Sequence, residues 1–128
     1  MLIKLKMFRY YNCNPKGRRV DDCVIRAISL AENKTWEETY DELSHYAKQE
    51  GILLNDVTFV DKYLENKYKD ECYKCNGSRA TVKEFLIKSR TGTYLIAMQG
   101  HITCAKDGII YDTWDCSNKR IWKVWEIE

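Results

Sequence analysis

The hydrophobic pattern of this chain changes near Gly92, and this change constrains the fold more than any other feature. Between residue 23 and Gly92, apolar residues recur every three or four positions, as on one face of a helix. After it they alternate with a period of two, as in strands. Helices followed by hairpin-connected strands predict an α+β fold, with N-terminal helices packed on a C-terminal antiparallel sheet. We expect one domain over residues 1–128, because a chain of 128 residues supports one core.

Four helices are expected before Gly92. The first, residues 23–31, follows Asp22, a residue type suited to the N-cap. It is almost wholly apolar, so we expect it to be buried, with Arg26 and Ser29 on a thin polar stripe. The expected bounds of the other three are residues 35–49, 55–66 and 81–89, the first and last of which open with a capping box. The expected inner face of the second helix comprises Trp36, Tyr40, Leu43 and Ala47.

The strands are expected at both ends of the chain. The opening MLIKLKMF alternates apolar residues with lysines and predicts a first strand. The other strands are expected at residues 93–98, 101–105, 109–114 and 120–127, while residues 67–80 are irregular or an edge strand. On the last strand, alternation places Ile121, Lys123, Trp125 and Ile127 on one side and Trp122 and Val124 on the other.

Composition narrows the classes of partner and compartment. The formal net charge is only +2, and the basic first 20 residues resemble a solvated edge, so we expect no nucleic-acid partner. The opening lacks the unbroken apolar stretch of a secretory signal, and no run is long enough to span a bilayer. We therefore expect a cytoplasmic protein with no membrane partner, whose six cysteines are reduced thiols.

A tight turn at Asp107-Gly108 would bring chemically active side chains together. If these two residues are the centre of the turn, His101 faces Trp114 and Thr103 faces Asp112. Since side chains alternate along a strand, His101, Asp112 and Trp114 then share a face. Asp112 is the diagonal neighbour of His101, within reach of one hydrogen bond, whereas Asp115 points away. A carboxylate bonded to one ring nitrogen leaves the other free to accept a proton from a nucleophile.

Cys23 is the candidate nucleophile. It lies in the first turn of a predicted helix, where unsatisfied N–H groups and the helix dipole favour a thiolate. A nearby imidazolium would favour the thiolate further, whereas an ionised Asp22 would oppose it.

These residues resemble the papain-like cysteine peptidases. Asp22-Cys23 opens a buried helix, Gly100-His101 follows on a strand, and Asp112-Thr113-Trp114 is similar to the Asn-Ser-Trp signature of that fold. The Asn-Pro-Lys-Gly loop before Asp-Cys-Val also resembles small bacterial and phage-encoded papain-like proteins. The likeness covers about residues 11–125.

The resemblance implies roles for individual residues. Cys23 would be the nucleophile, His101 the general base and acid, Asp112 the orienting group, and Trp114 the shield over that pair. The family's oxyanion-hole glutamine has no counterpart, since Gly17 stands at its position. Asn12 or Asn14 could supply a donor beside the backbone N–H of Cys23; Asn14 is preferred because Pro15 rigidifies its neighbourhood.

The expected activity is cysteine-dependent hydrolysis through an acyl-enzyme thioester, as in a peptidase, isopeptidase or deamidase. A peptide or protein is the expected substrate, and no cofactor is needed. The alternative is a catalytically idle papain-like domain, of phage origin for example, that acts by binding a host protein.

A structural zinc site is the third hypothesis. Cys72-x-x-Cys75 with His101-x-x-Cys104 imitates four-ligand spacing. His101 and Cys104 lie three residues apart on a predicted strand, however, so they should point to opposite faces. Cys13 or Cys116 could complete the set only through a contact that the sequence does not predict, and we therefore expect no metal.

Overall fold

We analysed a computed structural model of the chain, which describes residues 6–127 except 57, 72–73 and 76–77. The described helices are α1 (Cys23–Glu32), α2 (Trp36–Glu50), α3 (Phe59–Glu65) and α4 (Val82–Lys88). The described strands are β1 (Phe8–Tyr10), β2 (Asp70–Glu71), β3 (Lys74–Cys75), β4 (Ser78–Arg79), β5 (Thr93–Met98), β6 (His101–Lys106), β7 (Ile109–Asp112) and β8 (Ile121–Ile127). The α+β class expected from the change of pattern is confirmed.

The main sheet has the strand order β1-β7-β6-β5-β8-β2. Strands β5 to β8 pair in the antiparallel sense, as expected from their short connections. The expectation of a purely antiparallel sheet is wrong, because β1 pairs with β7 in parallel. The first strand also lies later than the lysine-alternating opening, of which residues 1–5 fall outside the described part.

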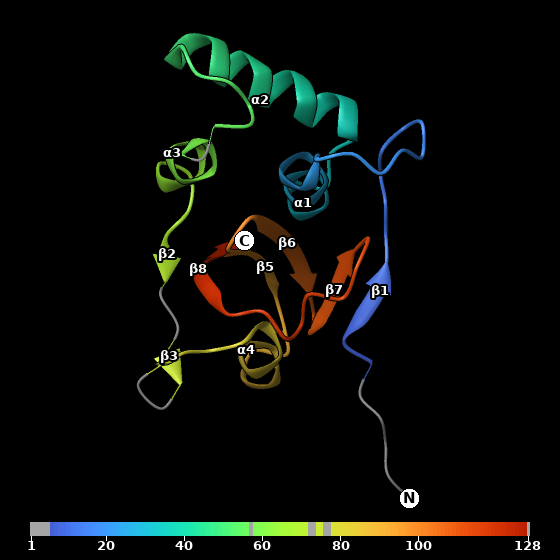
Figure 1. Ribbon diagram of the computed structural model, residues 1–128, viewed down its shortest axis with the longest axis vertical. Coiled ribbons are helices and arrows are strands. Elements are labelled where there is room, and N and C mark those ends of the chain that lie inside the picture. The colour runs from blue at the N-terminus through green and yellow to red at the C-terminus, as the bar shows by residue number, and fades with distance from the viewer. Residues whose placement is uncertain (1–5, 57, 72–73, 76–77, 128) are drawn as a thin grey trace, which may run out of the picture.

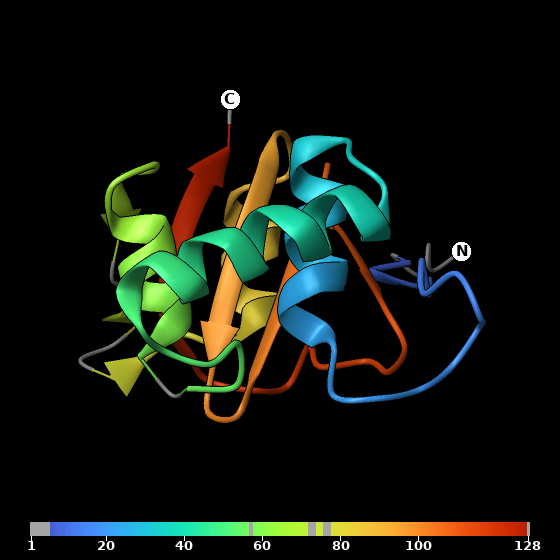
Figure 2. The same ribbon diagram turned by 90° about the horizontal axis from the view of Figure 1, so that it is seen from above.

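The helices cover both faces of the sheet unequally. Helix α1 packs on β6 and β5, and α2 lies across α1, with α3 beside it (Figures 1 and 2). Helix α4 lies on the opposite face (Figure 1). Two apolar clusters result, one between the sheet and α1 to α3 and one between the sheet and α4. The prediction that α1 is a mostly buried helix is confirmed.

Two tight turns position the strands that carry the candidate site. Gly100, with φ of 71°, lies in the left-handed region and turns β5 back into β6, directly before His101. Asp107 and Gly108, with φ of 49° and 82°, form the predicted hairpin turn between β6 and β7. The register that this turn predicts is confirmed where the strands pair, with Ala105 opposite Ile110.

The last strand departs from simple alternation. The pairing of β8 with β5 shifts register between Ala97 and Met98, which is a bulge. As a result Ile121 joins Val124 in the α4 cluster, while Trp125 and Ile127 pack under α1. The prediction that Ile121 shares a face with Trp125 is therefore wrong.

Some helix details also differ from expectation. The capping boxes at Thr35 and Thr81 are confirmed. The third helix begins at Phe59, later than expected, because Asp56 caps a preceding turn by accepting bonds from Thr58. Tyr40 is 43% exposed and stacks on Trp36, so it does not belong to the inner face of α2. Within the described residues, no helix combines the length and apolar character needed to cross a bilayer.

Candidate active site

The candidate site lies at one end of the sheet, where α1 begins. His101 is the first residue of β6 and Asp112 the last of β7. Because neighbouring antiparallel strands run in opposite directions, the start of one and the end of the next lie at the same end of the sheet. Cys23 is the first residue of α1, and its thiol lies close enough to the imidazole of His101 and the backbone of Ile102 for both to lower its pKa. The fold thus brings three distant segments together.

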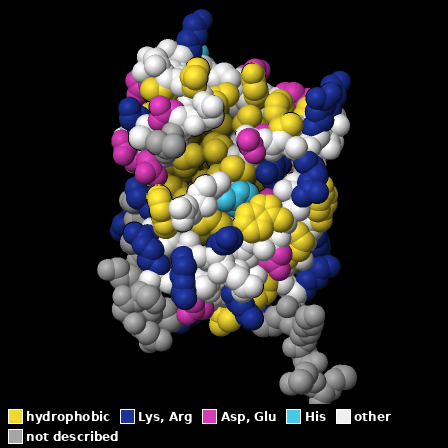
Figure 3. Space-filling model, viewed as in Figure 1, with side chains coloured by type: hydrophobic (Ala, Val, Ile, Leu, Met, Phe, Trp, Pro, Cys, Tyr) yellow, Lys and Arg dark blue, Asp and Glu magenta, His cyan; other side chains and the backbone are white. Residues whose placement is uncertain are grey.

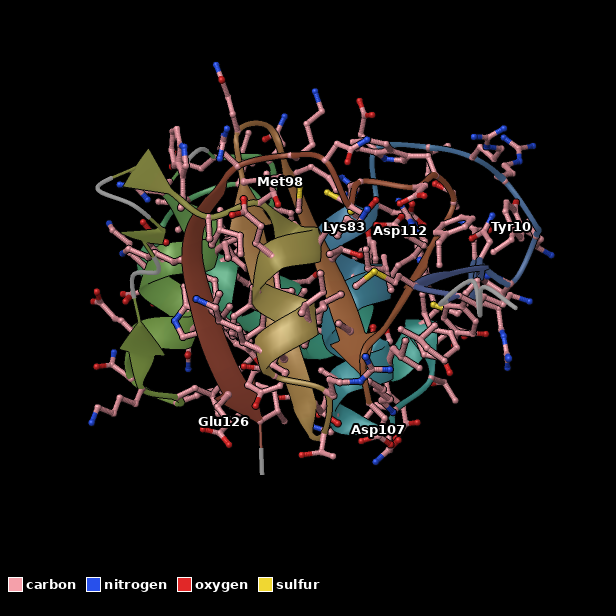
Figure 4. The ribbon with its side chains drawn as sticks, turned by 90° about the horizontal axis from the view of Figure 1, so that it is seen from below. Tyr10, Lys83, Met98, Asp107, Asp112 and Glu126 are labelled. Carbon is pink, nitrogen blue, oxygen red and sulfur yellow. The ribbon has the colours of Figure 1, made fainter. Side chains whose placement is uncertain are left out.

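The predicted partner of His101 is confirmed. Nε2 of His101 lies 2.7 Å from Oδ2 of Asp112, and both side chains are largely buried. Asp115 is engaged elsewhere, since its carboxylate accepts a bond from the backbone N–H of Ser117. With Nε2 on Asp112, the imidazole turns Nδ1 toward the remaining neighbours, which include the thiol of Cys23. Figure 4 labels Asp112, beside α1.

The surroundings of Cys23 and His101 favour their charged forms. Burial raises the pKa of Cys23, but the bond from His101, the backbone of Ile102 and the charges of His101 and Arg26 outweigh it and lower that pKa. Burial lowers the pKa of His101, but the bond to Asp112 and contacts with the thiols of Cys116 and Cys23 raise it overall. The arrangement therefore favours a thiolate beside an imidazolium.

A buried ion-pair chain supports Asp112, and sequence reasoning missed it. Arg26 donates from Nε to Oδ1 of Asp22 at 2.8 Å and from a terminal nitrogen to Oδ1 of Asp112 at 2.9 Å. Burial raises the pKa of Asp112, but the bonds from His101 and Arg26 lower it to about 2. The expected polar stripe of α1 is thus buried, because Arg26 and Ser29 face the sheet rather than solvent. The available signal was the i,i+4 spacing of Asp22 and Arg26.

Asp22 occupies the N-cap position but does not cap the helix with its side chain. Its carboxylate instead accepts bonds from Arg26, from Nε1 of Trp36 at 2.9 Å and from Nδ2 of Asn14 at 3.3 Å. Burial raises the pKa of Asp22, but these bonds lower it overall. The negative charge that was expected to oppose a Cys23 thiolate is therefore balanced by Arg26.

The candidate oxyanion donor Asn14 lies close to this cluster. Its Oδ1 accepts bonds from the backbone N–H groups of Lys16 and Arg18, which fixes the loop before α1. Its Nδ2 donates one bond to Asp22, and an amide nitrogen carries a second N–H. The other candidate, Asn12, donates to the backbone carbonyl of Arg18. The oxyanion role of Asn14 with the backbone N–H of Cys23 stays a prediction.

Trp114 lies over the imidazole. The ring centroids of His101 and Trp114 are 4.9 Å apart, and Trp114 is 37% exposed. The indole therefore covers one side of the His101–Asp112 pair while its outer face meets solvent. Figure 3 shows a histidine reaching this face of the molecule beside an apolar hollow.

Cys116 is a second thiol at the site that sequence reasoning assigned only as a conceivable metal ligand. It is fully buried and contacts His101. One donor atom from each of His101, Asp112 and Cys116 lies within 4.8 Å of the others, a spacing that would admit a metal ion such as zinc. Both Asp112 oxygens already accept bonds from cationic or N–H donors, however. We therefore favour the hydrogen-bonded pair over a metal centre.

The zinc set suggested by cysteine spacing is not assembled by the described residues. Cys104 is buried in the apolar cluster under α1, and the thiols of Cys13 and Cys104 are free of disulfide bonds. Burial raises the pKa of Cys104 to about 12, as in an apolar setting. Cys72 and the side chain of Cys75 lie outside the described part of the structure.

A pocket of about 310 Å³ lies beside the site, between the start of α1 and α2. Its walls include the two chain neighbours of Cys23, Asp22 and Val24, together with Trp36, Tyr40 and Leu54. Mostly apolar walls with a few polar groups are typical of ligand pockets, and this volume lies at the small end of their range.

Comparisons with known proteins leave the site to be interpreted from its own geometry. No protein-family model, curated protein or solved structure matched the chain.

Proposed function

We propose that this chain is a papain-like cysteine hydrolase that acts by acyl transfer on a peptide or protein. The observation that carries the proposal is the order Cys23, His101, Asp112: a thiol at a helix N-terminus, an imidazole near enough to lower the pKa of that thiol, and a carboxylate 2.7 Å from Nε2 of the imidazole. A nucleophile, a base and a group that orients the base are the requirements of covalent acyl transfer.

The chemistry follows from these positions. The Cys23 thiolate attacks the substrate carbonyl carbon and forms a C–S bond, while the carbonyl oxygen becomes an oxyanion beside the backbone N–H of Cys23. Collapse breaks the C–N bond, and Nδ1 of His101 gives its proton to the leaving amine. Water then loses a proton to His101 and attacks the thioester carbon; collapse breaks the C–S bond, releases the acid and restores the thiolate beside the imidazolium. No cofactor enters these steps.

The pocket between α1 and α2 supports a peptide as substrate. Asp22 and Val24, the two chain neighbours of Cys23, line it, whereas Cys23 and His101 are not among its walls. An apolar side chain of the substrate would pack against Val24, Trp36 and Leu54. The binding energy of such a side chain would orient the scissile bond.

A peptide library made from a whole proteome tests the proposal. We expect the wild-type protein, but not Cys23→Ala, to create new peptide termini, with an apolar residue enriched near the cleavage site. Glutamine deamidation in place of cleavage would assign the same chemistry to a deamidase. Identical spectra for wild type and Cys23→Ala would contradict a hydrolase that acts on peptides.

A binding role is the second candidate, favoured by the engagement of Asn14 with Asp22. If the amide of Asn14 serves only that carboxylate, the oxyanion has one donor fewer, which typically raises the barrier by about 2.7–4 kcal/mol. A biological effect that survives Cys23→Ala would support binding over catalysis.

A further inference from the structure

Arg26 lies at the centre of the buried polar cluster, and its side-chain hydrogen bonds go to Asp22 and Asp112 rather than to the thiol of Cys23. Its side chain is 9% exposed, and its two partners, Asp22 and Asp112, are 4% and 2% exposed. A buried guanidinium with two carboxylates requires good geometry to offset its loss of hydration. The planar fork of arginine supplies that geometry, since separate N–H groups point at separate carboxylates.

Asp112 is held at both of its oxygens. Oδ1 accepts bonds from Arg26 at 2.9 Å and from the backbone N–H of Thr113 at 2.7 Å. Oδ2 is thereby presented to His101. Without Arg26, Oδ1 would keep the bond from the backbone N–H of Thr113 but would lose its link to α1.

Arg26 is itself anchored from the far side. Asp22 binds Nε of Arg26 with Oδ1, and its Oδ2 accepts bonds from Trp36 and Asn14. The indole of Trp36 belongs to α2 and lines the pocket. A continuous series of hydrogen bonds thus runs from the pocket wall through Asp22 and Arg26 to Asp112 and His101.

We propose that Arg26 is a positioning residue: its guanidinium, anchored on Asp22, holds the Asp112 carboxylate in the orientation in which it binds His101. This inference rests on the proposed function and deepens it. It assigns to the loop and helix start around Asp22 a role in setting the geometry and charge of the nucleophile–base pair.

The positive charge of Arg26 also shifts the titration of His101 and Cys23, and the negative charge of Asp22 shifts it in the opposite direction. A cation beside Asp112 weakens the pull of that carboxylate on the His101 proton, and it also stabilises a thiolate at Cys23.

Several other titratable groups face this cluster. They are Asp22 and Cys23 on α1, Cys13 on the loop before it, His101 and Cys104 on β6, and Asp112 and Cys116 at and after the end of β7.

Two titrations on the full chain test the inference. The chain has only two histidines, so ¹⁵N spectra of the imidazoles resolve His101 against the exposed His45. The pH dependence of iodoacetamide alkylation at Cys23 gives the titration midpoint of the thiol, which is the pH at which half of it is ionised. In Arg26→Met we expect both midpoints to rise by on the order of one pH unit. Asp22→Asn removes one of the two negative charges beside Arg26, and we expect both titration midpoints to fall in this variant.

Arg26→Lys separates position from charge. Lysine keeps the charge but cannot bridge two carboxylates as the guanidinium does. We expect its midpoints to stay near those of the wild type, while the His101 bond to Asp112 loosens and the imidazole N–H proton exchanges faster with water. Lys67→Met, which breaks an ion pair at the other end of α1, is the matched control and should move neither midpoint.

The outcomes separate this inference from the proposed function. Wild-type Cys23 with a lowered titration midpoint, together with Arg26→Met and Asp22→Asn variants that leave both midpoints unmoved, would overturn the inference and leave the hydrolase proposal intact. An ordinary thiol midpoint in the wild type would count against the hydrolase itself. If Arg26→Met does not fold, Asp22→Asn and Arg26→Lys still decide, because both retain a cation next to Asp112.

Discussion

The two ends of α1 each bury a carboxylate beside a cation, but only one end is built for chemistry. At the C-terminal end, Glu32 accepts bonds from Lys67 and from the hydroxyl of Tyr68, which ties α1 to α3 and the segment after it. At the N-terminal end, Asp112 binds Arg26 and His101. In both places hydrogen bonds outweigh burial and lower the carboxyl pKa.

The difference lies in what each carboxylate holds. Among the described residues, Glu32 binds Lys67 and Tyr68 with no thiol–imidazole pair beside them, and a negative charge at the C-terminus of a helix is poorly placed with respect to the helix dipole. His101 has a second nitrogen that faces a thiol at the N-terminus of the same helix, where negative charge is favoured. A buried ion pair is therefore not itself a sign of function; the sign is the transferable proton beside a nucleophile.

The largest expected effect is on stability at the N-terminal end. Asp112→Ala leaves Arg26 and His101 buried without their common partner, and we expect it to lower the free energy of unfolding by about 3–5 kcal/mol. Glu32→Ala should cost less, about 1–2 kcal/mol, because Lys67 and Lys34 are 36% and 32% exposed and can be hydrated. Urea denaturation at neutral pH measures both. Equal losses would contradict the difference between the two ends.

The next effect is the pH dependence of stability that His101 causes, which the titration of Cys23 offsets in the wild type. The folded His101 keeps its proton above the unfolded pKa of about 6.5, so its stabilisation is lost as pH rises. The Cys23 pKa is lowered, so its contribution is gained as pH rises toward the unfolded value of about 8.5. As pH rises toward that value, the gain from Cys23 offsets part of the loss from His101, so the stability of the wild type should fall less steeply than His101 alone would make it.

Cys23→Ala removes the thiol, and with it the contribution to stability that offsets the loss from His101 as pH rises. Its free energy of unfolding should fall by about 1.4 kcal/mol per pH unit from about pH 6.5 upward. Urea denaturation of wild type and Cys23→Ala in matched buffers measures the slopes. Val82→Ala, which removes a fully buried and non-titratable side chain from the apolar cluster under α4, is a control for cavity formation alone. A wild-type slope as steep as that of Cys23→Ala would contradict the thiolate–imidazolium pair.

A smaller effect is expected for Lys67→Met. Because the ammonium is 36% exposed, we expect a loss of about 1 kcal/mol in unfolding free energy. The rate of Cys23 alkylation should be unchanged, which a parallel labelling experiment checks. Slower labelling would show that the two ends of α1 are coupled.

The smallest effect is expected for Trp114→Ala. The ring contact with His101 is worth about 0.5–1.5 kcal/mol, and the indole is partly exposed, so the loss should lie near the lower value. Alkylation of Cys23 should remain fast, since the bond to Asp112 stays. Trp122→Ala on β8 is the control for loss of an exposed indole.

The sequence predicted the site better at its strands than at its helix. The Asp107-Gly108 turn determines the pairing of β6 with β7, and this local signal led correctly to the contact between His101 and Asp112. Whether these residues catalyse, and whether the fold is papain-like, remain predictions.

Other features depend on long-range packing, which a local pattern does not contain. The helical pattern places Arg26 on a thin polar stripe but does not predict its partner, because Asp112 lies 86 residues away. The parallel pairing of β1 and the bulge opposite Met98 likewise depend on which segments meet at the sheet edge and how they fit. The exposure of Tyr40 follows from its stacking on Trp36, which no spacing rule predicts.

The most direct test of the central claim is the iodoacetamide labelling rate of Cys23, located by peptide mass spectrometry, in wild type and His101→Ala. The other five cysteines are internal controls. The account predicts fast labelling well below the ordinary thiol pKa of about 8.5, and a loss of that low-pH reactivity in His101→Ala. Labelling of Cys23 with an ordinary thiol profile, unaffected by His101→Ala, would contradict it.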